Sequence, residues 1–143
     1  MTKLSISTCL AGIATAATLV ASAAQADSFR AYNRVVVNPV SSSTFEAIEQ
    51  AQYGPRGLWC AAADYAQSQL GARGTDRVYV QTPRGNSVTQ SGRKGVVFGL
   101  SSPSGVAPVS VLSVSSAIRV PGSNLSVDHA YQFCYDSFLI NSR

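Results

Sequence analysis

Two cysteines, Cys60 and Cys134, constrain the fold of this chain more than any other feature of its sequence. The third cysteine, Cys9, lies in an N-terminal segment that we expect to be removed on export. Two cysteines in an exported chain most simply form one disulfide, because the compartments outside the cytoplasm are oxidising. Closing a loop of about 75 residues would stabilise the folded state by roughly 4 kcal/mol in the chain-entropy model.

Residues 1–26 have the organisation of a signal peptide. Lys3 supplies a positive charge, residues 10–20 are rich in Leu, Ala, Ile and Val, and Ala24-Gln25-Ala26 matches the small-residue cleavage signal. The apolar run is too short to predict a membrane span, and no later segment approaches its length. We therefore expect a protein of the periplasm or the cell exterior, with no transmembrane segment after cleavage. Removing 26 of the 143 residues leaves 117, enough for one domain over residues 27–143.

Strands are predicted where β-branched residues dominate or where apolar and polar residues alternate. The second of five such segments is ambiguous, because Ser43 to Glu46 also matches a helix capping box; we favour a strand there. The five segments are residues 32–37, 44–50, 76–81, 96–100 and 109–118.

Two helices are predicted, and each carries one of the cysteines. The first contains the stretch GLWCAAADYA, with Cys60 at the flank of an apolar stripe, and Gly71 is expected to end it. Ser126 is expected to cap the second helix. The stripes are Trp59, Ala62, Ala63, Ala66 and Leu70 on the first helix, and Val127, Ala130, Tyr131, Cys134 and Phe138 on the second.

A bridge between these stripes would clamp the two helices together, with Trp59 buried beside it. The expected fold class is α+β: a mainly antiparallel sheet of four to five strands with two helices on one face, stapled by one disulfide.

Three stretches, GLWCAAADYA, DRVYVQ and NLSVDHAYQFC, together resemble small predicted exported proteins of Gram-negative bacteria that have no assigned activity. The resemblance covers most of the chain after its first mature residues. It implies that Cys60 and Cys134 pair, because the family pattern carries both cysteines, and it implies no catalytic residue.

The familiar catalytic constellations are missing from the sequence. A cysteine nucleophile needs a neighbouring base, but His129 is predicted to lie on the far side of the helix from Cys134. Two cysteines and one histidine cannot supply a structural zinc site, and no G-x-S-x-G or phosphate-binding glycine motif occurs. We therefore expect no metal and no cofactor. An enzyme would have to be a small hydrolase that uses His129 or a Glu46/Glu49 pair.

The remaining functional signal is a polar segment, residues 82–95, that carries Arg84, Arg93 and Lys94. The formal net charge of +4 falls to +3 when Lys3 is removed, and it is spread along the chain, which argues against nucleic-acid binding. The favoured hypothesis is a non-enzymatic binding or accessory domain that contacts an anionic envelope component, such as a phosphorylated glycolipid or acidic polysaccharide. The alternative is a protein inhibitor that uses 82–95 as an exposed loop.

We predict that the exported protein begins at Asp27, because cleavage should follow Ala26. N-terminal sequencing or intact mass of secreted material checks this. Exported protein that retains Met1 would contradict it.

Overall fold

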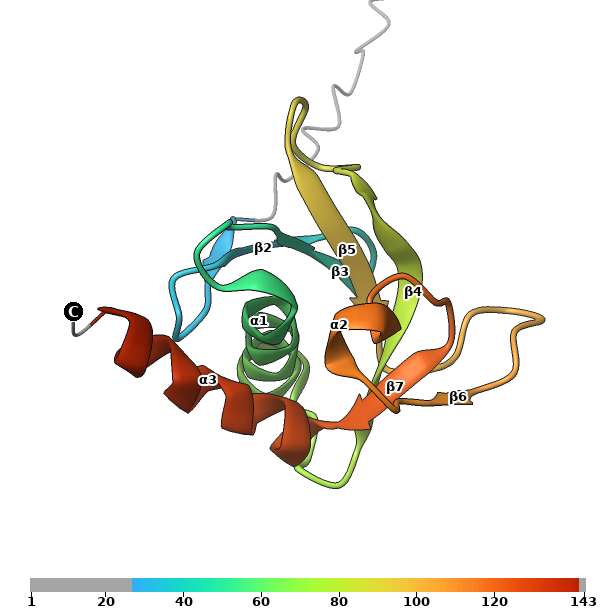
Figure 1. Cartoon of the computed structure of the whole chain (residues 1–143). Helices are drawn as coiled ribbons and strands as arrows, with labels where there is room; N and C mark the ends of the chain where they lie inside the picture. The colour runs from blue at the N-terminus through green and yellow to red at the C-terminus, as the bar shows by residue number, and fades with distance from the viewer. Residues whose placement is uncertain (1–26, 142–143) are drawn as a thin grey trace, which may run out of the picture.

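In this α+β fold, one curved sheet wraps around a central helix (Figure 1). The structure is a computed structural model that describes residues 27–141. The predicted signal peptide, residues 1–26, which includes Cys9, lies outside the described residues. The described part contains seven strands in one sheet and three helices. They are β1 (Phe29–Arg30), β2 (Val36–Pro39), β3 (Thr44–Ile48), α1 (Gly54–Leu70), β4 (Arg77–Asn86), β5 (Lys94–Gly99), β6 (Val109–Ser110), α2 (Val114–Ala117), β7 (Ser123–Ser126) and α3 (Val127–Asn141).

The sheet is mixed but mostly antiparallel, with the strand order β1-β2-β3-β5-β4-β7-β6. Only the edge strand β6 runs parallel to its neighbour, β7, among the described strands. Seven strands are more than the four to five that the sequence predicts. The two strands that the sequence did not predict are β1 and β7, whose two and four residues are too few for an alternating pattern to stand out.

The expected strand over residues 109–118 is wrong beyond Ser110, because the chain leaves the sheet and forms the short helix α2. Ala117 and Ile118 are both buried. Consecutive strand residues point to opposite faces of a sheet, so a strand could not direct both of these side chains into the core. The alternation of Val and Ser in this segment therefore belongs to a mostly exposed chain rather than to a half-buried strand.

The first predicted strand has a different start in the structure, and the ambiguous second one is a strand. The expected strand 32–37 begins only at Val36, because a tight turn with Arg34 at φ 65° precedes it. The ambiguous segment 44–50 is a strand over Thr44–Ile48, as favoured above.

Helix α1 is enclosed on nearly all sides. Its residues from Gly57 to Ala63 are all buried, because the sheet curls around one side and α3 covers another (Figure 1). Trp59 is fully buried, and its ring lies 5.1 Å from that of Phe98 on β5. Gly71 ends the helix in the left-handed conformation, with φ 66°, as predicted.

Helix α3 packs mainly against α1 rather than against the sheet. The two helices are therefore stacked, with α1 between the sheet and α3. The predicted Cys60–Cys134 disulfide is confirmed, with the two Cα atoms 4.9 Å apart and both side chains fully buried. Ser126 caps α3, since its Oγ accepts the N–H of His129 at 3.3 Å. The side chain of Phe138, the last member of the expected stripe, lies outside the described part.

None of the helices within residues 27–141 combines the length and the apolar character that crossing a membrane requires.

Trp59 faces the sheet whereas Cys60 faces α3, so these neighbours join α1 to two different layers.

Replacing both Cys60 and Cys134 with Ala should lower the free energy of unfolding by roughly 4 kcal/mol, because the unfolded chain regains the entropy of an open loop. Urea unfolding followed by Trp59 fluorescence measures this change. Maleimide labelling of denatured but unreduced mature protein should find no free thiol. One or two labelled cysteines would contradict the bridge.

Candidate functional site

The segment 82–95 is a β-hairpin that extends from the body of the sheet, and we call it the hairpin arm (Figure 1). It was expected to be a loop, but β4 continues to Asn86 and β5 begins at Lys94, which leaves 87–93 as the connection. Register shifts in β4 between Val80 and Gly85 break the regular pairing at the base of the arm. Such bulges bend a strand and change its twist.

Glu46 on β3 holds the connection of the arm in place. Its side chain is buried, with 1% exposed. The carboxylate accepts the backbone N–H groups of Val88 and Thr89, both at 2.9 Å, and the Ser87 hydroxyl at 2.8 Å. The Thr89 hydroxyl also donates to it and in turn accepts the Asn38 amide N–H at 2.9 Å. These four donors satisfy a charge that would otherwise be costly to bury.

The position of Glu46 follows from the alternation of the strand. Its neighbours Phe45 and Ala47 belong to the core beneath the sheet, where the Phe45 ring lies 4.4 Å from that of Tyr65 on α1. Glu46 therefore points to the opposite, outer face. Gly95 on β5 leaves room for it, because a Cβ at that position would lie 2.5 Å from Glu46 Oε1. Glycine at this position is thus required by the close approach of the carboxylate.

Backbone hydrogen bonds anchor both sides of the arm to the body. The N–H of Arg84 donates to the carbonyl of Ile118 at 2.8 Å, and the N–H of Glu49 donates to the carbonyl of Lys94 at 2.8 Å. Within the arm, Ser87 N–H donates to Arg93 O at 2.9 Å. The arm is consequently fixed at its base, along its second strand and at its connection.

The three cations of the arm have different partners. The Arg84 guanidinium pairs with the Glu49 carboxylate, with Nη2 2.7 Å from Oε2 and Nε 3.0 Å from Oε1. Arg93 donates instead to the backbone carbonyl of Glu49 at 3.2 Å, and Lys94 donates to Asn86 Oδ1 at 2.7 Å. The charge of Arg84 is therefore matched locally, whereas Arg93 and Lys94 each contact a neutral oxygen.

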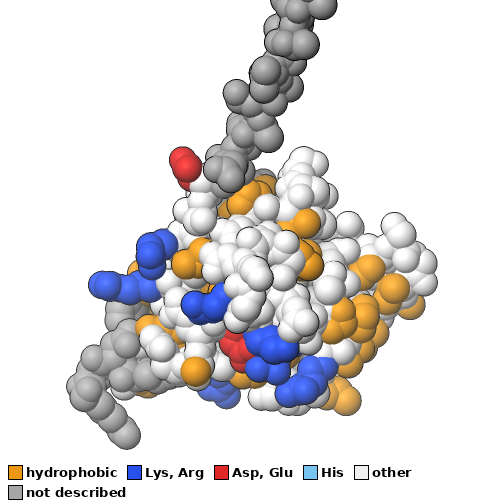
Figure 2. Space-filling view, turned by 90° about the horizontal axis from the view of Figure 1, so that it is seen from above, with side chains coloured by type: hydrophobic (Ala, Val, Ile, Leu, Met, Phe, Trp, Pro, Cys, Tyr) orange, Lys and Arg blue, Asp and Glu red, His pale blue; other side chains and the backbone are white. Residues whose placement is uncertain are grey.

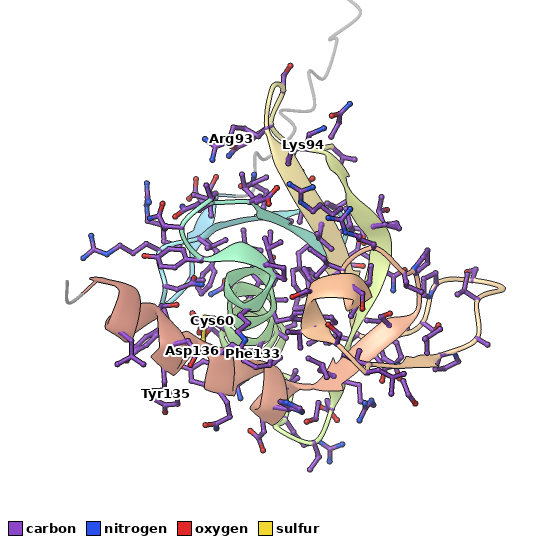
Figure 3. All side chains as sticks on the ribbon, in the orientation of Figure 1. Cys60, Arg93, Lys94, Phe133, Tyr135 and Asp136 are labelled. Carbon is purple, nitrogen blue, oxygen red and sulfur yellow. A yellow bond between two sulfur atoms is a disulfide. The ribbon has the colours of Figure 1, made fainter. Side chains whose placement is uncertain are left out.

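Arg93 and Lys94 are exposed on either side of the arm, with Arg93 toward Glu49 at the end of β3 and Lys94 toward Asn86 on β4 (Figure 3). Figure 2 views the molecule from this side and shows several Lys and Arg side chains with fewer acidic ones on the same face. The arm itself contains no Asp or Glu, and it thus presents positive charge at Arg93 and Lys94.

The other residues considered from the sequence lie elsewhere or are already engaged. Glu46 and Glu49 do not share a helix face, since Glu46 is in a strand; one binds the connection and the other pairs with Arg84. His129 is exposed on α3, with its ring 5.6 Å from that of Phe133. Cys134 forms the disulfide with Cys60 and is therefore not a free thiol. Within residues 27–141, no three His, Cys, Asp or Glu side chains are grouped so that they could hold a metal ion.

Sequence reasoning missed the role of Glu46 as the anchor of the arm. The signal was present in Phe45-Glu46-Ala47, where an acid stands between two core residues of a strand. Its partners could not be identified, because they lie more than forty residues along the chain.

Comparison with protein-family models found no family that matches this chain, and comparisons with curated proteins and with solved structures found no match either.

Glu46→Ala should lower the free energy of unfolding by about 3 kcal/mol, because it leaves several buried donors of the connection without an acceptor. Glu49→Ala is the matched control: it removes a partly exposed ion pair and should cost less than about 1 kcal/mol. Urea denaturation of the two variants measures both values. Equal costs would show that Glu46 does not anchor the arm.

Proposed function

We propose that this chain is a non-enzymatic, exported binding module that contacts an anionic envelope component through the hairpin arm. The observation that carries the proposal is the pairing pattern of the arm. Arg93 and Lys94 are exposed and contact only neutral oxygens among the described residues, while Arg84 is paired with Glu49. Two adjacent uncompensated cations attract phosphate or carboxylate groups.

The anchored connection supports a binding role because it reduces the cost of association. Ordering a flexible loop on binding costs conformational entropy, whereas a loop already held by Glu46 loses little. Arg93 is the last residue of this connection, and its carbonyl accepts the N–H of Ser87, so its guanidinium is carried on a fixed backbone. The ligand class would be a repeating anion, such as a phosphorylated glycolipid or an acidic polysaccharide, which can meet both cations at once.

A hydrolase receives less support from the same geometry. Glu46 is surrounded by hydrogen-bond donors of its own chain, and Glu49 is held by Arg84. A general acid or base must reach the proton that it transfers on the substrate. Both carboxylates would have to leave these partners before they could act.

A protein inhibitor is the second candidate, and Val88 is the observation that favours it. Its side chain is 60% exposed at the tip of the arm, although its N–H is bound by Glu46. An apolar side chain on a fixed, exposed loop suits insertion into the pocket of a partner protein. This role would depend on Val88 rather than on the two cations.

The double variant Arg93→Gln/Lys94→Gln should elute from a sulfated-polysaccharide matrix at a clearly lower salt concentration than the wild type, because binding to a polyanion is electrostatic and screened by salt. Val88→Ser should elute like the wild type.

Arg30→Gln/Arg73→Gln is a control of equal charge change, since it removes two exposed cations outside the arm, of which Arg73 is paired with Asp76. It should change the elution much less. Equal losses in the two double variants would mean that retention follows net charge and that the arm has no specific role.

A further inference from the structure

A hollow in the surface, which we call the α3 groove, lies on a different part of the molecule from the hairpin arm. It has a volume of about 450 Å³ and lies between segment 111–115 and the first two turns of α3. Arg56 from the first turn of α1 and Leu125 from β7 complete its lining. This volume is in the range of small-molecule sites, which is roughly 300–1,000 Å³.

One wall of the groove, segment 111–115, carries three apolar side chains and two serines. The side chain of Leu112 is 100% exposed, while Val111 and Val114 are half-buried against the core. Leu125 is buried at 6% exposure. The sequence around this wall is also neutral, since no charged residue occurs from Gly95 to Ile118.

The other wall carries basic groups on an aromatic ring. The Arg56 guanidinium lies 5.5 Å from the centre of the Phe133 ring, and the His129 ring lies 5.6 Å from the same ring. Arg56 and His129 both line the groove, whereas none of its lining residues is Asp or Glu. Figure 3 shows Phe133 and Asp136 on the side of α3 toward α1, with Tyr135 pointing away.

Asp136 fixes Arg56 without entering the groove. Its Oδ2 accepts from Arg56 Nη1 at 2.9 Å, and Asp136 lines a smaller hollow of about 300 Å³ that shares Arg56 and Phe133 with the groove. Nε and Nη2 of Arg56 have no hydrogen-bond acceptor among residues 27–141. A guanidinium presents its donors as a planar fork that matches a carboxylate.

We propose that the α3 groove binds a small, monomeric amphiphile that has an apolar body and a single carboxylate. The body would lie against Leu112 and Leu125, and the carboxylate would accept hydrogen bonds from Arg56, with the imidazole of His129 beside it. A cationic amphiphile would meet two basic side chains and no acid in this lining, and a neutral one would gain the apolar contact alone. The proposal does not depend on the function of the hairpin arm.

An NMR titration of mature protein with decanoate, kept below its micelle-forming concentration, tests the proposal. Saturable amide shifts should be confined to segment 111–115 and to the first two turns of α3. Decanol should bind at the same place about tenfold more weakly, and decyltrimethylammonium should not bind there. Shifts spread over the surface, no shifts at all, or tighter binding of the cationic probe would overturn the proposal.

Two variants assign the parts of the groove. Leu112→Ser should weaken both decanoate and decanol, and folding should be unaffected because this side chain is fully exposed. Arg56→Gln should weaken decanoate by about tenfold and leave decanol unchanged, since only the charged hydrogen bonds are lost. Val88→Ser, an exposed apolar residue on the hairpin arm, is the control and should change neither. Equal effects of Arg56→Gln on the two probes, or no effect on decanoate, would contradict recognition of the carboxylate.

Discussion

The enclosure of α1 is the constraint on which the rest of the structure depends. Alanines and one tryptophan make this helix apolar around much of its circumference, so that a sheet on one side alone could not bury it. The sheet therefore curls around the helix, and α3 covers the remaining side through the Cys60–Cys134 bridge. The Cys60–Cys134 bridge joins α1 to α3, and the Trp59–Phe98 contact joins α1 to the sheet. One turn of α1 therefore connects both the sheet and α3.

This arrangement places the described helices on the inner side of the sheet, so that none of them covers its outer face (Figure 1). A buried carboxylate on that face is unusual, since an unpaired charge there would be expensive. Glu46 is tolerated because the hairpin arm supplies four donors to it, and the same bonds fix the backbone beside Arg93. The Glu46 carboxylate thus fixes the shape of the arm and does not neutralise the positive charge of its cations. Glu49 matches the charge of Arg84, whereas Arg93 and Lys94 contact neutral oxygens, so that their positive charge is not matched locally.

Local patterns in the sequence predicted the α+β class, both long helices, the end of α1 at Gly71 and the disulfide, because these depend on periodicity, capping and a simple count of cysteines. The short pieces of the fold could not be predicted. α2 is set by the burial of Ala117 and Ile118 against distant parts of the chain, and β1 and β7 are short strands that depend on their partners β2 and β4. The cations of the arm were visible in the sequence, but their partners were not. Which of them is paired depends on Glu49, brought close only by the pairing of β3 with β5.

The central claim is that the arm is a preformed surface, held by Glu46, rather than a mobile loop. Backbone ¹⁵N relaxation of the free mature protein tests this most directly at the amides of Val88 and Thr89. Order parameters of about 0.85, equal to those of the central strands, are predicted, since both N–H groups are bound to a buried carboxylate. Values below about 0.6 would show a flexible connection and would contradict the claim.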